Sequence, residues 1–357
     1  MKIIDRYIIK KYLTTFFVML LLFIPIGIMV DIAEKIDKFR EKEVPFNEII
    51  NYYLDFTWHF ANILYPVFLF LSVIWFTSKL ASNTEVIAIL GSGISFLRFL
   101  KPYLISSTIV FGFSFIAGSF IIPKSNLGYN EFRYKYINKK KERNTSDVFQ
   151  QINENEFIYV SNYDPKRKRA NNFTLEHFDG NRMKFKIKAK TIRWIERDSI
   201  FRLSNYSKRT FIFNKEIYEK KSRKDTILDF SIDDLAPVTY LAETLTFFDL
   251  NKFISEEKER GSNLINEHLL VRYKRWSTPF SVFILTIIAV SVSSFKRRGG
   301  IGINLAFGVS LGFIFVFFDK IFGVLVAKST FSPFLAAWLP LIIFGFLGYF
   351  LLKYARQ

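Results

Sequence analysis

The sequence predicts an α-helical membrane protein with six transmembrane helices, divided three and three by an inserted antiparallel β domain. Three observations predict this fold: six long apolar runs, a polar insert after the third run, and short alternating segments within that insert. About 20 helical residues cross the roughly 30 Å hydrocarbon core of a bilayer, and every run is near or above that length. The runs lie at 12–30, 56–78, 102–123, 276–295, 299–318 and 329–352.

Five of the runs contain no charged residue, and His59 is the only His or charged residue in the second. Helices buried in a soluble protein are shorter and amphipathic, so we interpret all six runs as membrane spans. The first run resembles a signal peptide because Lys2, Arg6, Lys10 and Lys11 precede it. It is too long for the apolar region of such a peptide, and no cleavage site follows, so we expect a retained helix.

The positions of Lys and Arg predict the orientation, because cytoplasmic loops are enriched in these residues. Bases flank the spans on one side of the membrane, at residues 2–11, 79–101, 296–298 and 353–356. The other side has mixed charges at 31–51, the connection near Lys328 and a long insert. The bases of the insert do not contradict this orientation, because long domains cross the membrane regardless of their charge. We therefore expect cytoplasmic N- and C-termini and an extracytoplasmic insert.

The insert, from about residue 124 to 266, alternates apolar and polar residues in short segments, which is typical of half-buried strands. The segments are 156–160, 172–178, 183–189, 191–195, 199–206 and 210–213, and Asp179-Gly180-Asn181 is typical of a hairpin turn. This pattern predicts an antiparallel sandwich or jelly roll. Two interpretations stay open: a plain solubilising domain, or a sheet whose apolar inner face accepts lipid chains. A helical pattern resumes at 246–265.

Several chemistries are excluded by what the chain lacks. The net charge of +18 could indicate nucleic-acid binding, but part of the excess flanks the apolar runs. There is no Cys, and the chain has only three His, so we expect no metal site. The nucleotide-binding Gly-x-x-x-x-Gly-Lys-Ser/Thr motif is absent, as are Gly-x-Ser-x-Gly and His-Glu-x-x-His. We expect no catalytic residues, no cofactor in this chain and no enzymatic activity of its own.

The segment 79–95, between the second and third spans, predicts a short helix at about 82–95. Asn83 or Thr84 could cap it, and Glu85 would lie in its first turn, where the helix dipole favours an acid. An apolar stripe follows and ends at Gly91 or Gly93; its members are Val86, Ile87, Ile89 and Leu90. Such a helix either lies on the membrane or docks into a groove of a partner.

Charged and titratable residues also lie at the outer ends of the spans. Asp55, His59 and Asp319-Lys320 are either functional or simply placed near the headgroups. Bases at this depth can hold lipid phosphates; they are Lys35, Lys38, Arg40, Lys42, Lys124 and Arg133. The alternative is that they form salt bridges with neighbouring acids, namely Glu34, Asp37, Glu41 and Glu43.

Several stretches together resemble the LptF/LptG family of lipopolysaccharide export permeases, and within it the LptG branch. They are Asp5-Arg6-Tyr7-Ile8, Leu13-Thr14-Thr15-Phe16, the segment 85–94, Gly308-Val309-Ser310-Leu311-Gly312, Asp319-Lys320-Ile321-Phe322-Gly323 and Leu339-Pro340. The resemblance spans the whole chain. Each stretch alone is weak, but their order and spacing, with the three-domain-three layout, make the match specific.

The resemblance implies a permease subunit in the bacterial inner membrane with a periplasmic β-jelly-roll domain. In this family an LptF–LptG heterodimer is driven by two copies of the cytoplasmic ATPase LptB, which uses the ATP. The complex extracts lipopolysaccharide from the outer leaflet of the inner membrane and passes it to a periplasmic bridge built on LptC and LptA. The implied domains are residues 1–124 for helices one to three, 125–266 for the β domain and 267–357 for helices four to six.

The resemblance also implies roles for particular residues. Lys38, His59 and Arg133 fall at positions where the family has bases that contact the lipid. A family base at the outer end of the first helix is replaced here by Asp31, so the phosphate clamp would shift to Lys35, or the lipid head would carry less charge. Glu85 matches the acid of the family's coupling helix, with Val86, Ile89 and Leu90 as its apolar face, and Asp319 is the remaining candidate inside the membrane.

Two other functions fit the same layout. One is a permease for another lipid or for a lipoprotein, and the molecule that the β domain binds would distinguish it from a lipopolysaccharide permease. The other is a membrane-anchored scaffold or sensor whose periplasmic domain binds protein. A scaffold needs no ATPase, so co-purification of an ATPase through residues 79–95 separates it from a permease.

Overall fold

The computed structural model describes residues 2–137, 146–164, 167–196, 198–212, 215–228, 230, 240–259, 261–262, 264–295, 300–328 and 330–355. The chain forms two compact units. Unit 1 comprises residues 1–137, 243–248 and 266–357, and unit 2 comprises residues 138–242 and 249–265.

Within the described residues, six helical segments are long and apolar enough to cross a membrane, which confirms the predicted spans. They are α1 (Ile3–Glu41), α2 (Phe46–Ser82), the continuous segment Phe96–Ile137, α8 (Ile265–Ser293), α9 (Gly300–Ala327) and α10 (Pro333–Ala355). A short helix, α3 (Glu85–Gly91), connects the second span to the third.

The third span continues well beyond its apolar run. It consists of α4 (Phe96–Ile116), the π-helical turn η1 (Ala117–Ile121), α5 (Ile122–Phe132) and a second π-helical turn, η2 (Arg133–Ile137). Pro123 has no backbone N–H, and its ring collides with the preceding turn of a regular helix. The wider turn η1 directly before it relieves this conflict without ending the helix. As a result, Arg133 lies on a helical extension of the span.

The core of unit 1 contains buried residues of α1, α2, α4 and α8, and α1 and α9 pack along α2. Tyr12, Leu69 and Tyr103 are completely buried there. The Tyr12 hydroxyl forms hydrogen bonds with Ser107 Oγ at 3.2 Å and with Thr286 Oγ1 at 2.9 Å. A buried hydroxyl without such partners would be costly, so these bonds fix α1 against α4 and α8.

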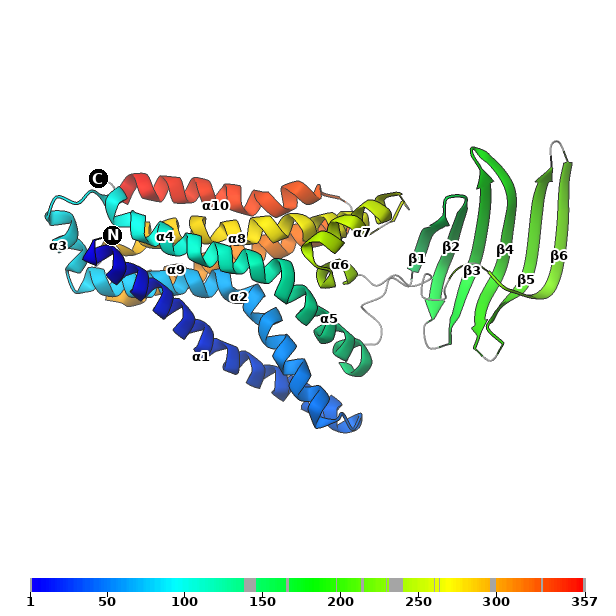
Figure 1. The fold of residues 1–357 in the computed structure, drawn as a ribbon, viewed down its shortest axis with the longest axis horizontal. Helices are drawn as coiled ribbons and strands as arrows, with labels where there is room; N and C mark the ends of the chain where they lie inside the picture. The colour runs from blue at the N-terminus through cyan, green and yellow to red at the C-terminus, as the bar shows by residue number, and fades with distance from the viewer. Residues whose placement is uncertain are drawn as a thin grey trace. The chain divides into compact units, whose positions relative to one another are not determined.

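The helices of unit 1 run between two ends (Figure 1). The two chain termini and α3 lie at one end, which we name the α3 end. At the opposite end, α1 turns into α2 through residues 42–45, and we name this the hairpin end.

Unit 2 contains a six-stranded antiparallel sheet, which confirms the predicted β domain between the helices. Its strands are β1 (Ser146–Asn153), β2 (Glu156–Asp164), β3 (Arg169–Asp179), β4 (Arg182–Ile195), β5 (Ile200–Ile212) and β6 (Lys215–Thr226). The strand order is that of a meander, because each strand pairs with its neighbours in the chain (Figure 1). The predicted Asp179-Gly180-Asn181 hairpin is confirmed as the β3–β4 turn, where Gly180 has a φ of +58°.

Alternate residues of the central strands build one apolar core, which includes Val160, Phe173, Ile192 and Leu203. The segments 183–189 and 191–195, predicted as separate strands, form the single strand β4, and 199–206 joins the following segment in β5. After the sheet, α6 (Leu241–Thr244) and α7 (Phe247–Glu259) lead towards α8, and α7 lies within the predicted helical stretch.

Candidate functional site

At the hairpin end, five buried aromatic rings from α1, α2 and α5 pack together, and we name them the aromatic cluster. Its members are Phe39, Tyr52, Phe56, Tyr129 and Phe132. Tyr52 lies at the centre, stacked on Phe132 at 4.3 Å and on Tyr129 at 5.6 Å between ring centroids. The rings come from positions three or four residues apart on α2 and α5, which share one helix face. The cluster therefore depends on the extension of the third span.

Lys35 is buried beside this cluster together with an acid. Its ammonium group forms an ion pair with Asp31, one turn earlier on α1, and donates a hydrogen bond to the Tyr52 hydroxyl at 2.8 Å. The hydroxyls of Tyr52 and Tyr53 donate to the Asp31 carboxylate, each at 3.2 Å. Lys35 also lies 5.4 Å from the centroid of the Tyr52 ring. The lysine is thus neutralised by Asp31, which stands outside the set of acids predicted as salt-bridge partners.

His59 and Arg133 lie on the same aromatic ring. The imidazole of His59 stacks on Tyr129 at 4.1 Å, and the guanidinium of Arg133 lies 5.2 Å from the centroid of that ring. His59 Nδ1 donates to Asn126 Oδ1 at 2.8 Å, since a carbonyl oxygen can only accept. The structure therefore brings Lys35, His59 and Arg133 together around the aromatic cluster. Lys38 is exposed in the last turns of α1.

Asp319 lines a cavity of about 340 Å³ within unit 1. Its carboxylate accepts a hydrogen bond from Lys274 of α8 at 2.7 Å. His59 and Glu243 also line this cavity. Lys274 and Glu243 are not predicted from the sequence, because both lie outside the apolar runs.

At the α3 end, the helix α3 begins after Thr84, which has a φ of +63°. The predicted side-chain cap is absent, since the Thr84 hydroxyl donates to the Asn83 carbonyl instead. Glu85 accepts hydrogen bonds from the Tyr7 hydroxyl at 3.1 Å and from Asn83 Nδ2 at 3.2 Å. Glu85 is thereby attached to α1.

Three of the four residues in the apolar stripe of α3 face the protein itself, and Ile87 does not. Val86 is buried in the core of unit 1, and Ile89 and Leu90 pack against that core. The exposed residues of α3 include Ile87 and Ala88. A partner that approaches α3 from outside would therefore meet Ile87 and Ala88 beside the half-buried Glu85.

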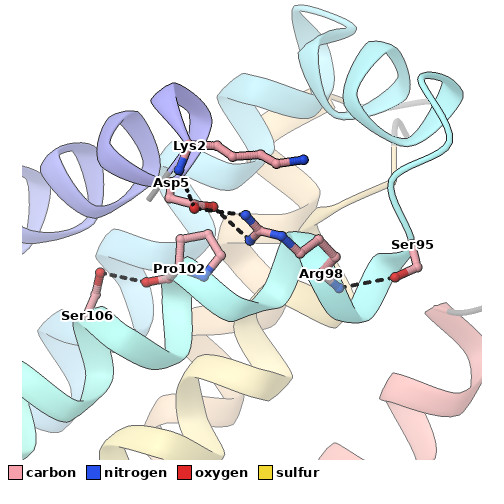
Figure 2. Close-up of polar contacts among 6 residues, drawn as sticks. All are labelled: Lys2, Asp5, Ser95, Arg98, Pro102 and Ser106. Atoms are coloured by element: carbon pink, nitrogen blue, oxygen red, sulfur yellow. Dashed lines mark hydrogen bonds and ion pairs between the residues drawn. The ribbon is translucent and has the colours of Figure 1, made fainter.

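A second polar contact lies next to α3 (Figure 2). The guanidinium of Arg98, on α4, donates two hydrogen bonds to the two carboxylate oxygens of Asp5, on α1, each at 2.8 Å. Asp5 is buried and also accepts a hydrogen bond from the backbone N–H of Lys2 at 2.9 Å. The sequence does not predict this pair, because its members are 93 residues apart.

Within the described part of the chain, no group of three or more His, Asp or Glu residues is arranged to hold a metal ion. The architecture is that of a multi-pass membrane protein with one inserted β domain. In unit 1, a basic and aromatic cluster lies at the hairpin end and a short surface helix at the α3 end. A family model described as "Lipopolysaccharide export system permease LptF/LptG" matches residues 6–354. The chain therefore belongs to the LptF/LptG family of lipopolysaccharide export permeases, and is a multi-pass protein of the inner membrane.

The chain is similar to the lipopolysaccharide export system permease protein LptG of Escherichia coli strain K12. The two are 20% identical over 353 residues, which cover 98% of each chain. The same identity and coverage hold for LptG of Escherichia coli O6:H1.

Proposed function

We propose that this chain is one permease subunit of an ATP-driven complex that extracts lipopolysaccharide from the outer leaflet of the inner membrane. The complex would then pass the lipid to a periplasmic β bridge. One observation carries the proposal: basic residues and aromatic rings gather at the hairpin end of α1, while the other end of the same helix contacts α3. A lipid-binding region and a surface for a motor protein thus share one continuous helix.

In this proposal the α3 end is cytoplasmic and the hairpin end and β domain are periplasmic. The distribution of Lys and Arg along the sequence supports this orientation. The implied partners are an LptF-like permease as the other half of a heterodimer, a dimer of the ATPase LptB, and the periplasmic proteins LptC and LptA.

The hairpin end supplies the groups that a phosphorylated lipid head requires. Arg133 and the exposed Lys38 can donate hydrogen bonds to phosphate oxygens, and the aromatic cluster offers an apolar surface beside them. Lys35 is engaged by Asp31, so it would contribute only if a phosphate displaced that carboxylate. The acyl chains would be shielded from water by the helices and then by the apolar face of the sheet.

ATP hydrolysis would take place in the partner, because the sequence lacks the phosphate-binding motif of such ATPases. The exposed face of α3, with Ile87 and Ala88 beside Glu85, would enter a groove of the ATPase and transmit its movement. The alternative for α3 is a position flat on the membrane surface.

The test is purification of the tagged chain in mild detergent, followed by mass spectrometry of the bound proteins and lipids. We expect a second permease, an ATPase and lipopolysaccharide. Matched purifications of Glu85→Arg and of Lys135→Glu, a substitution at the hairpin end, show whether ATPase recovery depends on α3. A periplasmic protein partner without an ATPase would instead indicate a scaffold, and a different bound lipid would indicate a permease for that lipid.

A further inference from the structure

Asp5 in the first turn of α1 forms an ion pair with Arg98 of α4. We propose that this ion pair is a positioning element for coupling: it sets the rotation of α1 so that Tyr7 holds Glu85 in place for the ATPase. This rests on the proposed function, in which α3 is the surface that the ATPase contacts.

The geometry of the pair favours positioning over simple charge neutralisation. Two parallel hydrogen bonds of 2.8 Å join the guanidinium of Arg98 to both oxygens of Asp5. Such a planar, two-pronged contact fixes direction as well as distance, which a single ammonium group cannot do. Asp5 is 6% exposed, so water competes little for its oxygens.

Asp5 also defines where α1 begins. Its side chain accepts the backbone N–H of Lys2, which lies at the N-terminal cap of the helix, and this bond holds the first turn. The ion pair with Arg98 therefore fixes both the start of α1 and the face that α1 turns towards α4.

Tyr7 follows two residues later, about 200° around the helix from Asp5. Asp5 faces α4, while the Tyr7 hydroxyl donates to Glu85 of α3 at 3.1 Å. The first turns of α1 are thus held between α4 and α3. A rotation of α1 caused by loss of the Asp5 contact would move the Tyr7 hydroxyl away from the Glu85 carboxylate.

The helix α3 needs such an external contact. It has seven residues, too few to be stable alone, and its N-terminal cap lacks a side-chain hydrogen bond. Thr84 before the helix and Gly93 after it have left-handed backbone conformations, with φ of +63° and +85°. Packing of Val86 against the core keeps α3 close to the other helices of unit 1. The Tyr7–Glu85 hydrogen bond additionally restrains the orientation of α3.

The helix α1 also connects this contact to the proposed lipid-binding region at the hairpin end. α1 is continuous from Ile3 to Glu41, so it contains Asp5 and Tyr7 at one end and Lys35 at the other. Tyr12 fixes α1 against α4 and α8 between these points. A displacement of α3 by the ATPase would therefore reach α1 through Tyr7, close to the point where Tyr12 holds α1 against α4 and α8.

The test uses the complete complex, reconstituted in proteoliposomes with its ATPase. The variants are Arg98→Gln, Asp5→Asn and the exchanged pair Asp5→Arg with Arg98→Asp. Arg202→Gln is the matched control, because Arg202 forms an equivalent two-bond contact with Asp225 in the β domain at 2.9 Å. The measured quantity is the number of lipid molecules released per ATP hydrolysed.

We expect Arg98→Gln and Asp5→Asn to keep ATP hydrolysis within about two-fold of the wild type, while lipid released per ATP falls about five-fold, the loss typical of one strong hydrogen-bonded contact. The exchanged pair should recover most of the ratio, and Arg202→Gln should leave it unchanged. A purely structural role would lower both activities together and in proportion to thermal stability. That result, or a wild-type ratio in Arg98→Gln, would overturn the inference.

A crosslinking arm separates failure of the inference from failure of the proposed function. The chain contains no Cys, so Ile87→Cys introduces a single reactive site on the exposed side of α3. Absence of crosslinks to the ATPase in the otherwise unchanged chain would refute the docking of α3 itself. Crosslinks of equal yield and pattern with and without Arg98→Gln would leave the docking intact and refute positioning by Asp5 and Arg98.

Discussion

The buried pair of Asp31 and Lys35 allows a quantitative prediction about the hairpin end. Lys35→Met would remove the cation and leave the Asp31 carboxylate with the Tyr52 and Tyr53 hydroxyls as donors. Asp31→Asn would remove the anion and leave the ammonium group with Tyr52. The double substitution would remove both charges while filling similar volume.

The expected energies follow from burial. Each side chain of the pair is 10% exposed, and loss of one partner of a buried pair costs about 3–5 kcal/mol. We expect about 3 kcal/mol of lost unfolding free energy for Lys35→Met. Asp31→Asn should cost about 2 kcal/mol, because the flexible lysine can extend towards water. The double variant should lose less than about 1 kcal/mol, since a neutral replacement of a buried pair is close to neutral.

The assay is a double-mutant cycle of the purified protein, unfolded by increasing mole fractions of dodecyl sulfate in mixed micelles. Tyr53→Phe is the control, because it removes one hydroxyl donor and leaves both charges; its expected cost is about 1 kcal/mol. If the loss of unfolding free energy in the double variant equals the sum of the losses in the two single variants to within about 0.5 kcal/mol, the pairing is refuted. In addition, Asp31→Asn should increase photo-crosslinking of lipid near Lys35, because it frees the ammonium group.

Three further predictions concern the proposed function. Glu85→Arg should abolish lipopolysaccharide export in cells while the chain stays in the membrane, and normal export would contradict the coupling role of α3. Lys38→Glu and Arg133→Glu should each reduce photo-crosslinking of lipopolysaccharide to the hairpin end; unchanged yields in both would exclude a phosphate clamp there. Tyr129→Leu removes the ring on which His59 and Arg133 lie, so unfolding free energy should fall by about 1–2 kcal/mol beyond the control Tyr218→Leu, an exposed ring.

The spans were predictable because length and lack of charge are unambiguous signals for a bilayer. The central strands were predictable for a similar reason: one face is buried and the other solvated, so apolar residues alternate. The edge strands β1 and β6 escaped prediction. In β6 nearly every residue is exposed, and its sequence is dense in Lys, Arg and Glu, which suits an edge exposed to water but leaves no apolar alternation.

The functional region was predictable in residue type but not in arrangement. Bases near the outer ends of the helices are visible in the sequence, yet the contacts of Lys35 with Asp31 and Tyr52 depend on how α1 and α2 meet. Tyr129 lies in the helical extension of the third span, which continues past the end of its apolar run. For α3, the stripe of Val86, Ile89 and Leu90 predicts a buried face, but a stripe does not identify what buries it.

The meander order of the sheet has a consequence for how the chain is made. Every strand pairs with a neighbour in sequence, so all partner strands have been synthesised once β6 is complete, before the first residue of α8 is added. Sheets with such local contacts form faster than those that must wait for distant strands. The β domain can therefore fold during synthesis, hairpin by hairpin, while insertion of the last three helices is still to come.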